Sequence, residues 1–260
     1  MPSVRKVAVL THGKPDTIGD AVQRFERAAQ AAGAEVVDDG DADLLVVLGG
    51  DGTMLRALKH SLDTGAPVLG VNFGRVGFLT ALDDAELEPG LARVFAGEYT
   101  VVELPTLEIE LGGRLHTAVN DCVATSSTIG RMVLLGWSVG GEDLGTLSCD
   151  GVIAATPSGS TAYNLSNGGP VLVWGLDAMV VTFIAPHSLN ARPLVVPRSS
   201  DVVVENKTID VPLTVLADGH EIGKLGFGER VMIRLGEKRS RLATVPESTF
   251  FTRYRDTFAS

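Results

Sequence analysis

The chain of 260 residues has few of the features that mark secreted or membrane-spanning proteins. Its only cysteines, Cys122 and Cys149, are isolated and lack the spacing of metal ligands, so we expect reduced thiols that serve packing. The longest apolar stretch, residues 171–185, is too short to span a bilayer and contains Asp177, and the N-terminus lacks the apolar length of a secretory signal. These absences predict a soluble, cytoplasmic protein without a membrane partner.

A basic surface is missing as well. The formal net charge is −10, and the densest basic segment is the short run Glu-Lys-Arg-Ser-Arg at residues 237–241. Nucleic acids are held chiefly by clustered Lys and Arg, so we expect no nucleic-acid partner. Neither a Gly-x-x-x-x-Gly-Lys-[Ser/Thr] loop nor a Gly-x-Gly-x-x-Gly fingerprint after a strand occurs, so any phosphate must be bound by another kind of loop.

The most informative stretch that is present is LLVVLGGDGT, residues 44–53. Five apolar residues without polar alternation predict a strand buried on both faces, as in a parallel sheet. The glycines that follow allow positive φ and a close approach of a ligand, and Met54–His60 has the spacing of a helix. A strand, a glycine turn and a helix start present free amides at the edge where open α/β sheets bind nucleotides.

Asp51 is the unusual residue of this turn, because a carboxylate among phosphate-binding amides repels phosphate. Its expected partner is therefore a hydroxyl or a metal ion. For an isolated Gly-Gly-Asp-Gly, the alternative that Asp51 only caps the helix is equally open.

The chain on either side of this stretch predicts two domains. Strands are expected at Val4–Thr11, Glu35–Val37 and Val68–Asn72, and a helix at Ile18–Ala32. The strand at Glu35–Val37 is expected at an edge, because only six residues separate it from the next strand. Alternating strands and helices predict an α/β domain with a parallel sheet over residues 1–97. Short β-rich runs separated by turns predict a mostly antiparallel β-sandwich over residues 98–239.

Two further segments complete the pattern. Residues 150–170, DGVIAATPSGSTAYNLSNGGP, predict a strand, a turn of small hydroxyl residues and a short helix. There Ser158, Ser160 and Thr161 offer hydroxyls and amides suited to ribose and phosphate oxygens. The C-terminal segment, residues 240–260, has aromatic residues at helical spacing and is expected to return to the first domain.

These motifs resemble, in order and spacing, those of the NAD kinases. The matching motifs are GGDGT at 49–53, Asn120-Asp121, TPSGSTAY at 156–163, SNGGP at 166–170, APHSL at 185–189 and Asp218-Gly219. The resemblance covers nearly the whole chain, and TPSGSTAY is its most specific part, because lipid kinases share GGDGT. It implies phosphoryl transfer from ATP, or from polyphosphate in some members, to the adenosine ribose 2′-hydroxyl of NAD, which gives NADP.

The resemblance also implies roles for individual residues. Asp51 is the expected catalytic proton acceptor beside the 2′-hydroxyl, Arg56 faces phosphate, and Asn120 with Asp121 reads the adenine edge and a ribose hydroxyl. The implied NAD-binding residues are Asp51, Gly52, Arg56, Phe73, Asn120, Asp121, Arg131, Asp150, Ser158, Thr161, Ala162, Tyr163, Asn164, Leu165, Ser166 and Ala185.

The phosphoryl donor is expected to rest on the glycine turn, with Mg²⁺ bridging its oxygens. The expected donor-phosphate residues are Gly49, Gly50, Gly52 and Thr53. No protein ligand of the metal is assigned. The family further implies a homodimer or homotetramer.

Three positions depart from the usual family pattern. Asp121 stands where Glu is common, Ser158 where Thr is common, and Asn167 where Ala is common. None of these changes removes a reacting group. Two alternatives stand beside the kinase. A lipid kinase needs an apolar cleft or a basic membrane face, and a silent dinucleotide-binding regulator would arise most simply by loss of Asp51.

Overall fold

The computed structural model describes residues 1, 3–11, 19–74 and 77–259. By its internal contacts the chain divides into two compact units, Met1–Glu103 with Ser240–Ser260 and Leu104–Arg239. The sequence pattern changes near Gly97, before the division at Glu103, because β6 (Thr100–Leu111) begins within the first unit. No helix within these described residues is long and apolar enough to cross a membrane.

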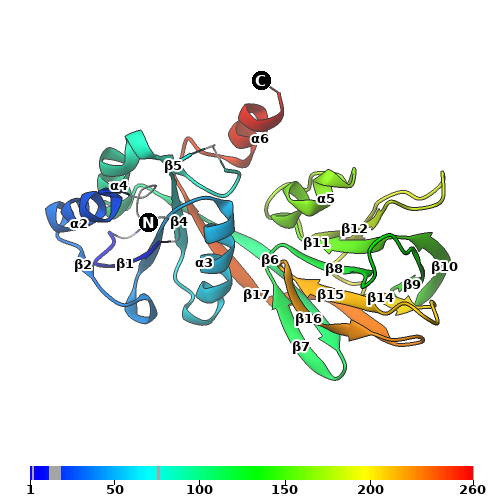
Figure 1. Ribbon diagram of the computed structural model, residues 1–260. Coiled ribbons are helices and arrows are strands. Elements are labelled where there is room, and N and C mark those ends of the chain that lie inside the picture. The colour runs from blue at the N-terminus through cyan, green and yellow to red at the C-terminus, as the bar shows by residue number, and fades with distance from the viewer. Residues whose placement is uncertain (2, 12–18, 75–76, 260) are drawn as a thin grey trace. The chain divides into compact units, whose positions relative to one another are not determined.

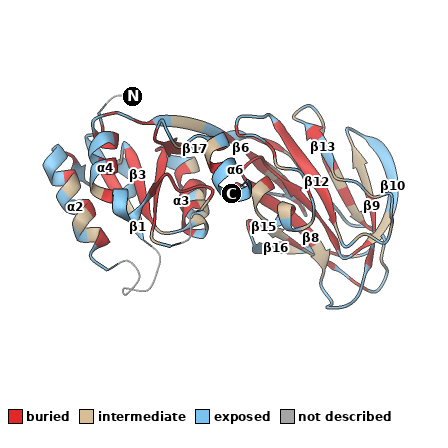
Figure 2. Ribbon diagram, turned by 90° about the horizontal axis from the view of Figure 1, so that it is seen from above, coloured by how far each residue is buried: buried red, intermediate tan, exposed pale blue. Residues whose placement is uncertain are grey.

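A parallel sheet is the centre of the first unit (Figure 1). β3 (Leu44–Leu48) lies between β1 (Lys6–Thr11) and β4 (Val68–Asn72), and all five of its residues are buried (Figure 2). The short strand β2 (Glu35–Val36) pairs with the outer side of β1, and β5 (Leu82–Asp83) pairs with β4. The α/β fold predicted for this part of the chain is confirmed.

The edge position of β2 explains its short connection to β3. β1 lies between the two strands, and Val7 of β1 pairs with both Val36 and Leu44. The connection, which contains the 3₁₀ turn η1 (Asp39–Asp41), therefore has only to pass the start of one strand. A crossover of a dozen or more residues is usual between parallel strands, but Val36 and Leu44 lie level with the same residue of β1, so here the chain need not return along a full strand.

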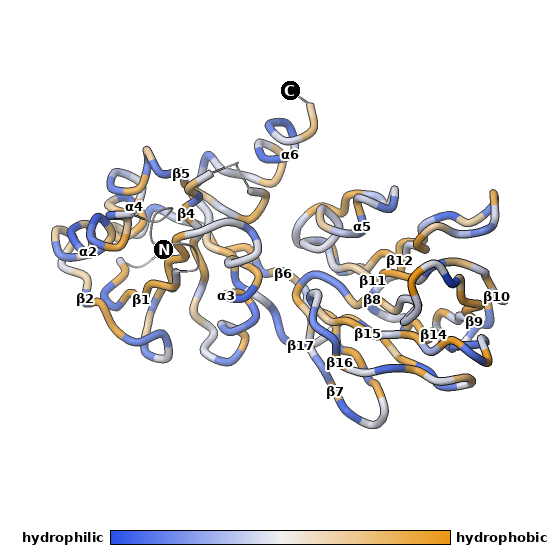
Figure 3. The backbone as a smooth tube through the Cα atoms, in the orientation of Figure 1, coloured by the Kyte–Doolittle hydropathy of each residue, from blue (hydrophilic) through white to orange (hydrophobic). Residues whose placement is uncertain are grey.

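Helices cover both faces of this sheet (Figure 1). α2 (Ala21–Ala32) and α4 (Leu87–Phe95) pack together on one face, where the rings of Phe25 and Phe95 meet edge to face at 6.5 Å. α3 (Asp51–Thr64) lies on the other face. In Figure 3, α2 contains both hydrophilic and hydrophobic residues, and its buried residues follow the helical repeat: Ala21, Phe25 and Ala29. The predicted start of this helix, Ile18, lies outside the described residues.

The C-terminal segment belongs to the first unit, as predicted. The end of β17 (Arg230–Thr244) pairs in parallel with β4, and α6 (Phe250–Phe258) follows. Phe250 is buried, and its ring meets that of Phe78 at 5.5 Å. The other aromatic residues of α6 are not covered as expected, because Phe251 is 68% exposed and Tyr254 is 42% exposed.

The second unit is an antiparallel β-sandwich, as predicted. One sheet has the order β13 (Leu194–Pro197), β12 (Ala178–Ile184), β11 (Gly151–Ala155), β8 (Asp121–Ser126), β15 (Leu213–Ala217) and β16 (His220–Leu225). The other contains β10 (Glu142–Cys149), β9 (Val133–Val139), β14 (Val202–Asn206), β17, β6 and β7 (Arg114–Ala118).

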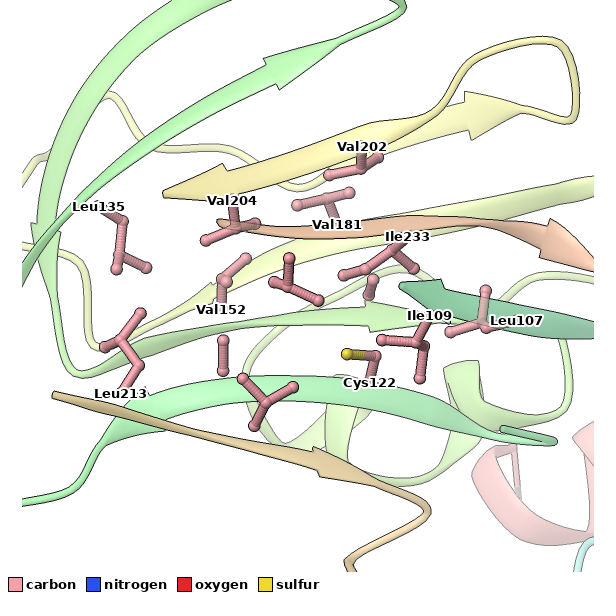
Figure 4. Packing of buried hydrophobic residues seen from close by; sticks show 14 of the residues in the cluster. Leu107, Ile109, Cys122, Leu135, Val152, Val181, Val202, Val204, Leu213 and Ile233 are labelled. Atoms are coloured by element: carbon pink, nitrogen blue, oxygen red, sulfur yellow. The ribbon is translucent and has the colours of Figure 1, made fainter. Parts of the chain in front are cut away.

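Apolar side chains from both sheets form the core of this sandwich (Figure 4). Val204 and Ile233 come from one sheet, and Val152 and Cys122 come from the other. Cys122 and Cys149 are both buried and free, and burial raises the pKa of the Cys149 thiol to about 12. They are packing residues, as expected.

Candidate active site

Asp51 begins α3 directly after the buried strand β3, and its carboxylate is held by the chain that follows β4. Oδ2 accepts a hydrogen bond from Phe78 N at 2.8 Å, and Oδ1 accepts one from Leu79 N at 3.0 Å. The residue that caps the helix is Gly50, so Asp51 does not cap it. Two backbone amides thus fix the orientation of a half-buried carboxylate at the end of a parallel sheet.

The glycines around Asp51 act differently from the prediction. Gly50 has φ −89°, and Gly52 lies inside α3, so neither uses a left-handed conformation. The glycine that the carboxylate requires is Gly77, because a Cβ there would lie 2.1 Å from Asp51 Oδ1. Residues 75 and 76, which precede it in the predicted loop, lie outside the described residues.

The start of α3 offers fewer free amides than its sequence indicates. Gly49 N donates to Val71 O at 2.9 Å, and Thr53 N donates to Gly50 O at 2.9 Å. The Thr53 side chain is also buried. These two amides are thus used within the chain, whereas the first-turn amides of Asp51 and Gly52 lack an intrahelical acceptor. The predicted donor contacts of Gly49, Gly50, Gly52 and Thr53 stay predictions.

Two other predicted residues of the first unit are Arg56 and Phe73, which follows β4. Arg56 is exposed on α3. Phe73 is half-buried and packs against the apolar core of the unit. Their predicted contacts with NAD stay predictions.

In the second unit, Asp218 fixes the segment that precedes β8. Its carboxylate accepts hydrogen bonds from Val119 N at 3.0 Å and from Asn120 N at 2.8 Å. From the other side, Thr156 Oγ1 donates to Val119 O at 2.7 Å, and Thr156 N donates to Asn120 O at 2.9 Å. Gly159 lies against the same backbone, because a Cβ there would come within 2.0 Å of Asn120 O. The Asn120 backbone is thus held on two sides.

The Asn120 side chain has an acceptor atom without a hydrogen-bond donor. Its Oδ1 is buried and has no hydrogen-bond partner among the described residues. A buried polar atom without a partner costs about 1–3 kcal/mol. Such an atom in a rigid segment is a binding-site signal, because a ligand donor can remove that cost.

Asp121 lies next to this atom in the chain and is only 7% exposed. Burial, and secondly the negative charge of Asp218, raise the pKa of Asp121 to about 7. A hydrogen-bond donor or a positive group from a ligand would favour the ionised carboxylate. The two neighbouring side chains therefore form a polar recognition element with unsatisfied acceptor capacity.

The hydroxyls of the serines after β11 make hydrogen bonds within the protein. Ser158 Oγ donates to Val119 O at 3.1 Å, and Ser160 Oγ donates to Pro157 O at 2.7 Å. Both side chains are buried and their hydroxyls donate within the chain, and their predicted contacts with ribose or phosphate stay predictions. The predicted helix is also only the 3₁₀ turn η3 (Gly159–Thr161) and the single turn α5 (Tyr163–Ser166).

Asn164 also supports this turn with its side chain. Nδ2 donates to Ser160 O at 3.0 Å and to Pro170 O at 3.1 Å, and Oδ1 accepts from Thr182 Oγ1 at 2.7 Å. The other predicted residues of the turn are half-buried or exposed, and their ligand contacts stay predictions: Thr161, Ala162, Tyr163, Leu165 and Ser166.

Three predicted NAD-binding residues lie apart from Asp121. β8 and β11 pair Asp121 with Ala155 at one end and Thr125 with Gly151 at the other. Asp150 precedes Gly151, and its amide donates to Ile184 O, next to Ala185, at 2.9 Å. Asp150 and Ala185 are thus one strand length, about 16 Å, from Asp121. Arg131 is exposed and pairs with Asp210 at 2.8 Å.

Comparison with known proteins agrees with these motifs. The ATP-NAD kinase N-terminal domain model matches residues 10–99, and the ATP-NAD kinase C-terminal domain model matches residues 119–245. This chain belongs to the NAD kinase family. The NAD kinases of Heliobacterium modesticaldum and Symbiobacterium thermophilum are each 40% identical over 219 residues, which are 82% of this chain and 77% of the relative.

Solved structures of NAD and NADH kinases share the fold. The crystal structure of an NAD kinase from Archaeoglobus fulgidus in complex with ATP has a TM-score of 0.79 at 28% identity and covers 98% of this chain and 97% of that chain. Yeast NADH kinase complexed with NADH has a TM-score of 0.82 at 25% identity and covers 99% of this chain and 88% of that chain. The predicted family, fold class and NAD kinase activity are confirmed.

The raised pKa of Asp121 predicts how the stability of this NAD kinase depends on pH. In the unfolded chain the carboxyl ionises near 3.8, whereas the folded chain holds its proton up to about 7. The folded state binds more protons at Asp121 in this window, so the contribution of Asp121 to stability falls as the pH rises from about 4 to 7. Asp121→Asn removes this titration and should gain about 2–4 kcal/mol on the wild type at pH 8 and little at pH 4.

Urea unfolding of both proteins at pH 4, 6 and 8 measures this difference. A stability difference that is the same at all three pH values would contradict the assignment, because only a titrating group produces the pH dependence.

Proposed function

We propose that Asp51 is the catalytic base of this NAD kinase and that Asn120 and Asp121 bind the adenosine of NAD. The observation that carries the first assignment is the clamped Asp51 carboxylate, which two backbone amides hold at the N-terminus of α3. The second assignment rests on the buried, partnerless Oδ1 of Asn120 beside the buried Asp121.

The chemistry of phosphoryl transfer gives Asp51 its role. The transition state is loose, so catalysis depends mainly on positioning and on stabilising charge. A fixed carboxylate within hydrogen-bond reach of the ribose 2′-hydroxyl orients this nucleophile and accepts its proton as the bond to phosphorus forms. A carboxylate already held by two amides loses little further freedom when the substrate binds.

The donor phosphates are proposed to contact the first turn of α3. The positive end of a 14-residue helix and the first-turn amides of Asp51 and Gly52 favour an anion. The Archaeoglobus relative was solved in complex with ATP, which supports ATP as the donor; polyphosphate is the alternative.

The residues of the first unit are compatible with a metal ion that binds together with the phosphoryl donor. Among the described residues, no three His, Cys, Asp or Glu side chains gather into a metal site. Mg²⁺ commonly keeps several waters and is bound through substrate phosphates with only one or two carboxylates. When bound, Mg²⁺ would neutralise charge on the donor oxygens, and Asp51 is the carboxylate proposed to lie nearest to it.

For NAD, the two acceptors of the second unit match donors on adenosine. The adenine amino group can donate to Asp121, and a ribose hydroxyl can donate to Asn120 Oδ1. The yeast relative complexed with NADH supports a dinucleotide ligand. The asparagine is preorganised, because Asp218 and Thr156 hold its backbone on both sides.

We also propose a cytoplasmic homo-oligomer, a dimer or tetramer, assembled through the second unit. Asp150 and Ala185 lie a strand length from Asp121, so a second copy can bring its own pair to a dinucleotide bound at Asp121. Exposed apolar side chains on the same unit give such a contact its surface: Leu134, Leu144, Leu189, Leu194 and Val195.

Replacing the proposed base tests catalysis separately from binding. Asp51→Asn keeps the shape of the side chain but removes the proton acceptor, so kcat should fall by about 10²-fold or more while KM for NAD stays nearly constant. NADP formation is followed with Mg²⁺, NAD and either ATP or polyphosphate. Wild-type kcat in the variant would remove Asp51 from the mechanism.

Asp121→Ala should act mainly on the affinity for NAD. Loss of a hydrogen bond to a charged acceptor is worth about 1.5–3 kcal/mol, so KM should rise about ten- to a hundredfold. Discrimination against the hypoxanthine analogue of NAD should disappear, because that base has a carbonyl where adenine has a donor. Retained preference for adenine would contradict the assigned contact.

Light scattering tests the assembly. At micromolar concentration we expect a mass at least twice that of the 27.3 kDa chain. Leu144→Asp, placed on the exposed apolar surface, should shift the mass towards the monomer, with Leu115→Asp, also exposed, as the matched control. A monomer for the wild type would contradict the proposal.

A further inference from the structure

α6 directs one charged side chain into the interior of the first unit. Arg253 is only 5% exposed, and its guanidinium is surrounded by oxygen atoms. Nη1 donates to Phe78 O at 2.8 Å and also to Thr80 O, and Nη2 donates to Thr244 Oγ1 at 3.0 Å. A buried charge is retained in a protein only where specific contacts compensate its lost hydration.

The Arg253 contacts lie on the same short segment that holds the proposed base. The amides of Phe78 and Leu79 donate to the Asp51 carboxylate, while the carbonyls of Phe78 and Thr80 accept from Arg253. Backbone amides of residues 78–80 thus bind the Asp51 carboxylate, and backbone carbonyls of the same segment bind the Arg253 guanidinium. A shift of this segment moves both amides that orient the carboxylate.

We propose that Arg253 is a positioning residue for the reaction: it fixes residues 78–80 and, through them, the Asp51 carboxylate. This inference rests on the proposed role of Asp51 as the base. It makes the C-terminal helix part of the catalytic apparatus, although Arg253 itself touches no reacting atom.

The charge of Arg253 also helps to hold the Asp51 carboxylate in place. Burial lowers the pKa of Arg253 to about 10, and the Asp51 carboxylate acts against this shift. The guanidinium is therefore charged at neutral pH, and it attracts the Asp51 carboxylate. A planar guanidinium can also reach several carbonyl oxygens at once, which a lysine ammonium on a flexible stem cannot do in the same geometry.

The packing of α6 has a separate source. Phe250 is buried against Phe78. The helix start is capped by Thr249, whose side chain accepts from Thr252 N at 3.2 Å. Removing the Arg253 guanidinium therefore leaves the aromatic contact and the cap of the helix in place, so a test on this residue can separate positioning from docking.

The first test compares Arg253→Met with Arg255→Met. Arg255 lies on the same helix, is exposed, and its side chain pairs with the neighbouring Asp256 at 2.8 Å, so its variant should retain wild-type kinetics. Arg253→Met should lower kcat about 10–100-fold, the scale expected when a reacting group is displaced by about 1 Å, while KM for NAD changes less than about twofold. An unchanged kcat in Arg253→Met would overturn the inference.

A double-mutant cycle separates positioning from general loss of structure. In the Asp51→Asn background the base is already absent, so adding Arg253→Met should lower kcat by less than about threefold. A residue that only supports the fold would lower kcat by the same factor in both backgrounds, and that result would overturn the inference.

The same cycle distinguishes the two proposals. If Asp51→Asn alone keeps the wild-type kcat, the proposed function fails, and the inference fails with it. If Asp51→Asn loses activity while the Arg253 variants keep theirs, only the inference fails. Should Arg253→Met not fold, the cycle is measured with Arg253→Lys, which keeps the charge but not the planar set of donors; a wild-type kcat there would also overturn the inference.

Discussion

Two hydrogen bonds from the amides of Phe78 and Leu79 to the Asp51 carboxylate are the constraint on which the first unit depends. They require α3 to begin immediately after β3, because only then does residue 51 reach the loop that follows β4. They also require a residue without a side chain at position 77. The fully buried strands β3 and β4 supply the rigid edge from which both partners extend.

The two neighbouring carboxylates of the second unit, Asp218 and Asp121, have different surroundings. Asp218 is satisfied by amides of Val119 and Asn120 and serves as a structural clamp. Asp121, buried beside it, has its pKa raised to about 7 by burial and by that neighbouring charge. One carboxylate is thus used to order the backbone, and the other is left with a high-energy charged form that a ligand donor can stabilise.

Local patterns in the sequence predicted much of this arrangement. The unbroken apolar run at residues 44–48 predicted the buried strand, and the specific TPSGSTAY motif indicated the family over the whole chain. A motif gives residue types but not the direction of each side chain. The motif therefore suggests a ligand for Ser158 and Ser160, whereas in the structure both hydroxyls donate to backbone carbonyls.

Contacts between distant parts of the chain could not be predicted from the sequence either. Arg253 and Phe78 are 175 positions apart, and nothing in the local composition of either segment indicates their hydrogen bond. The glycine turn shows the same limit at short range. The sequence points to Gly50 and Gly52 as flexible residues. The glycine that the Asp51 carboxylate needs is Gly77, which lies in the loop after β4. Only the paired strands β3 and β4 bring the two loops together.

Backbone strain in the described chain lies at one predicted binding position, Ala185, and at Asp218, the clamp of the Asn120 backbone. The non-glycine residues with positive φ there are Ala185, at 44°, and Asp218, at 51°. A left-handed conformation costs about 1–2 kcal/mol for a residue such as alanine and less for aspartate. At Asp218 the three hydrogen bonds of its carboxylate offset this cost. Ala185 has no polar side chain to compensate it, so the strain there must be offset by the pairing of β12 or by a ligand, and strained residues that persist in this way are concentrated at functional sites.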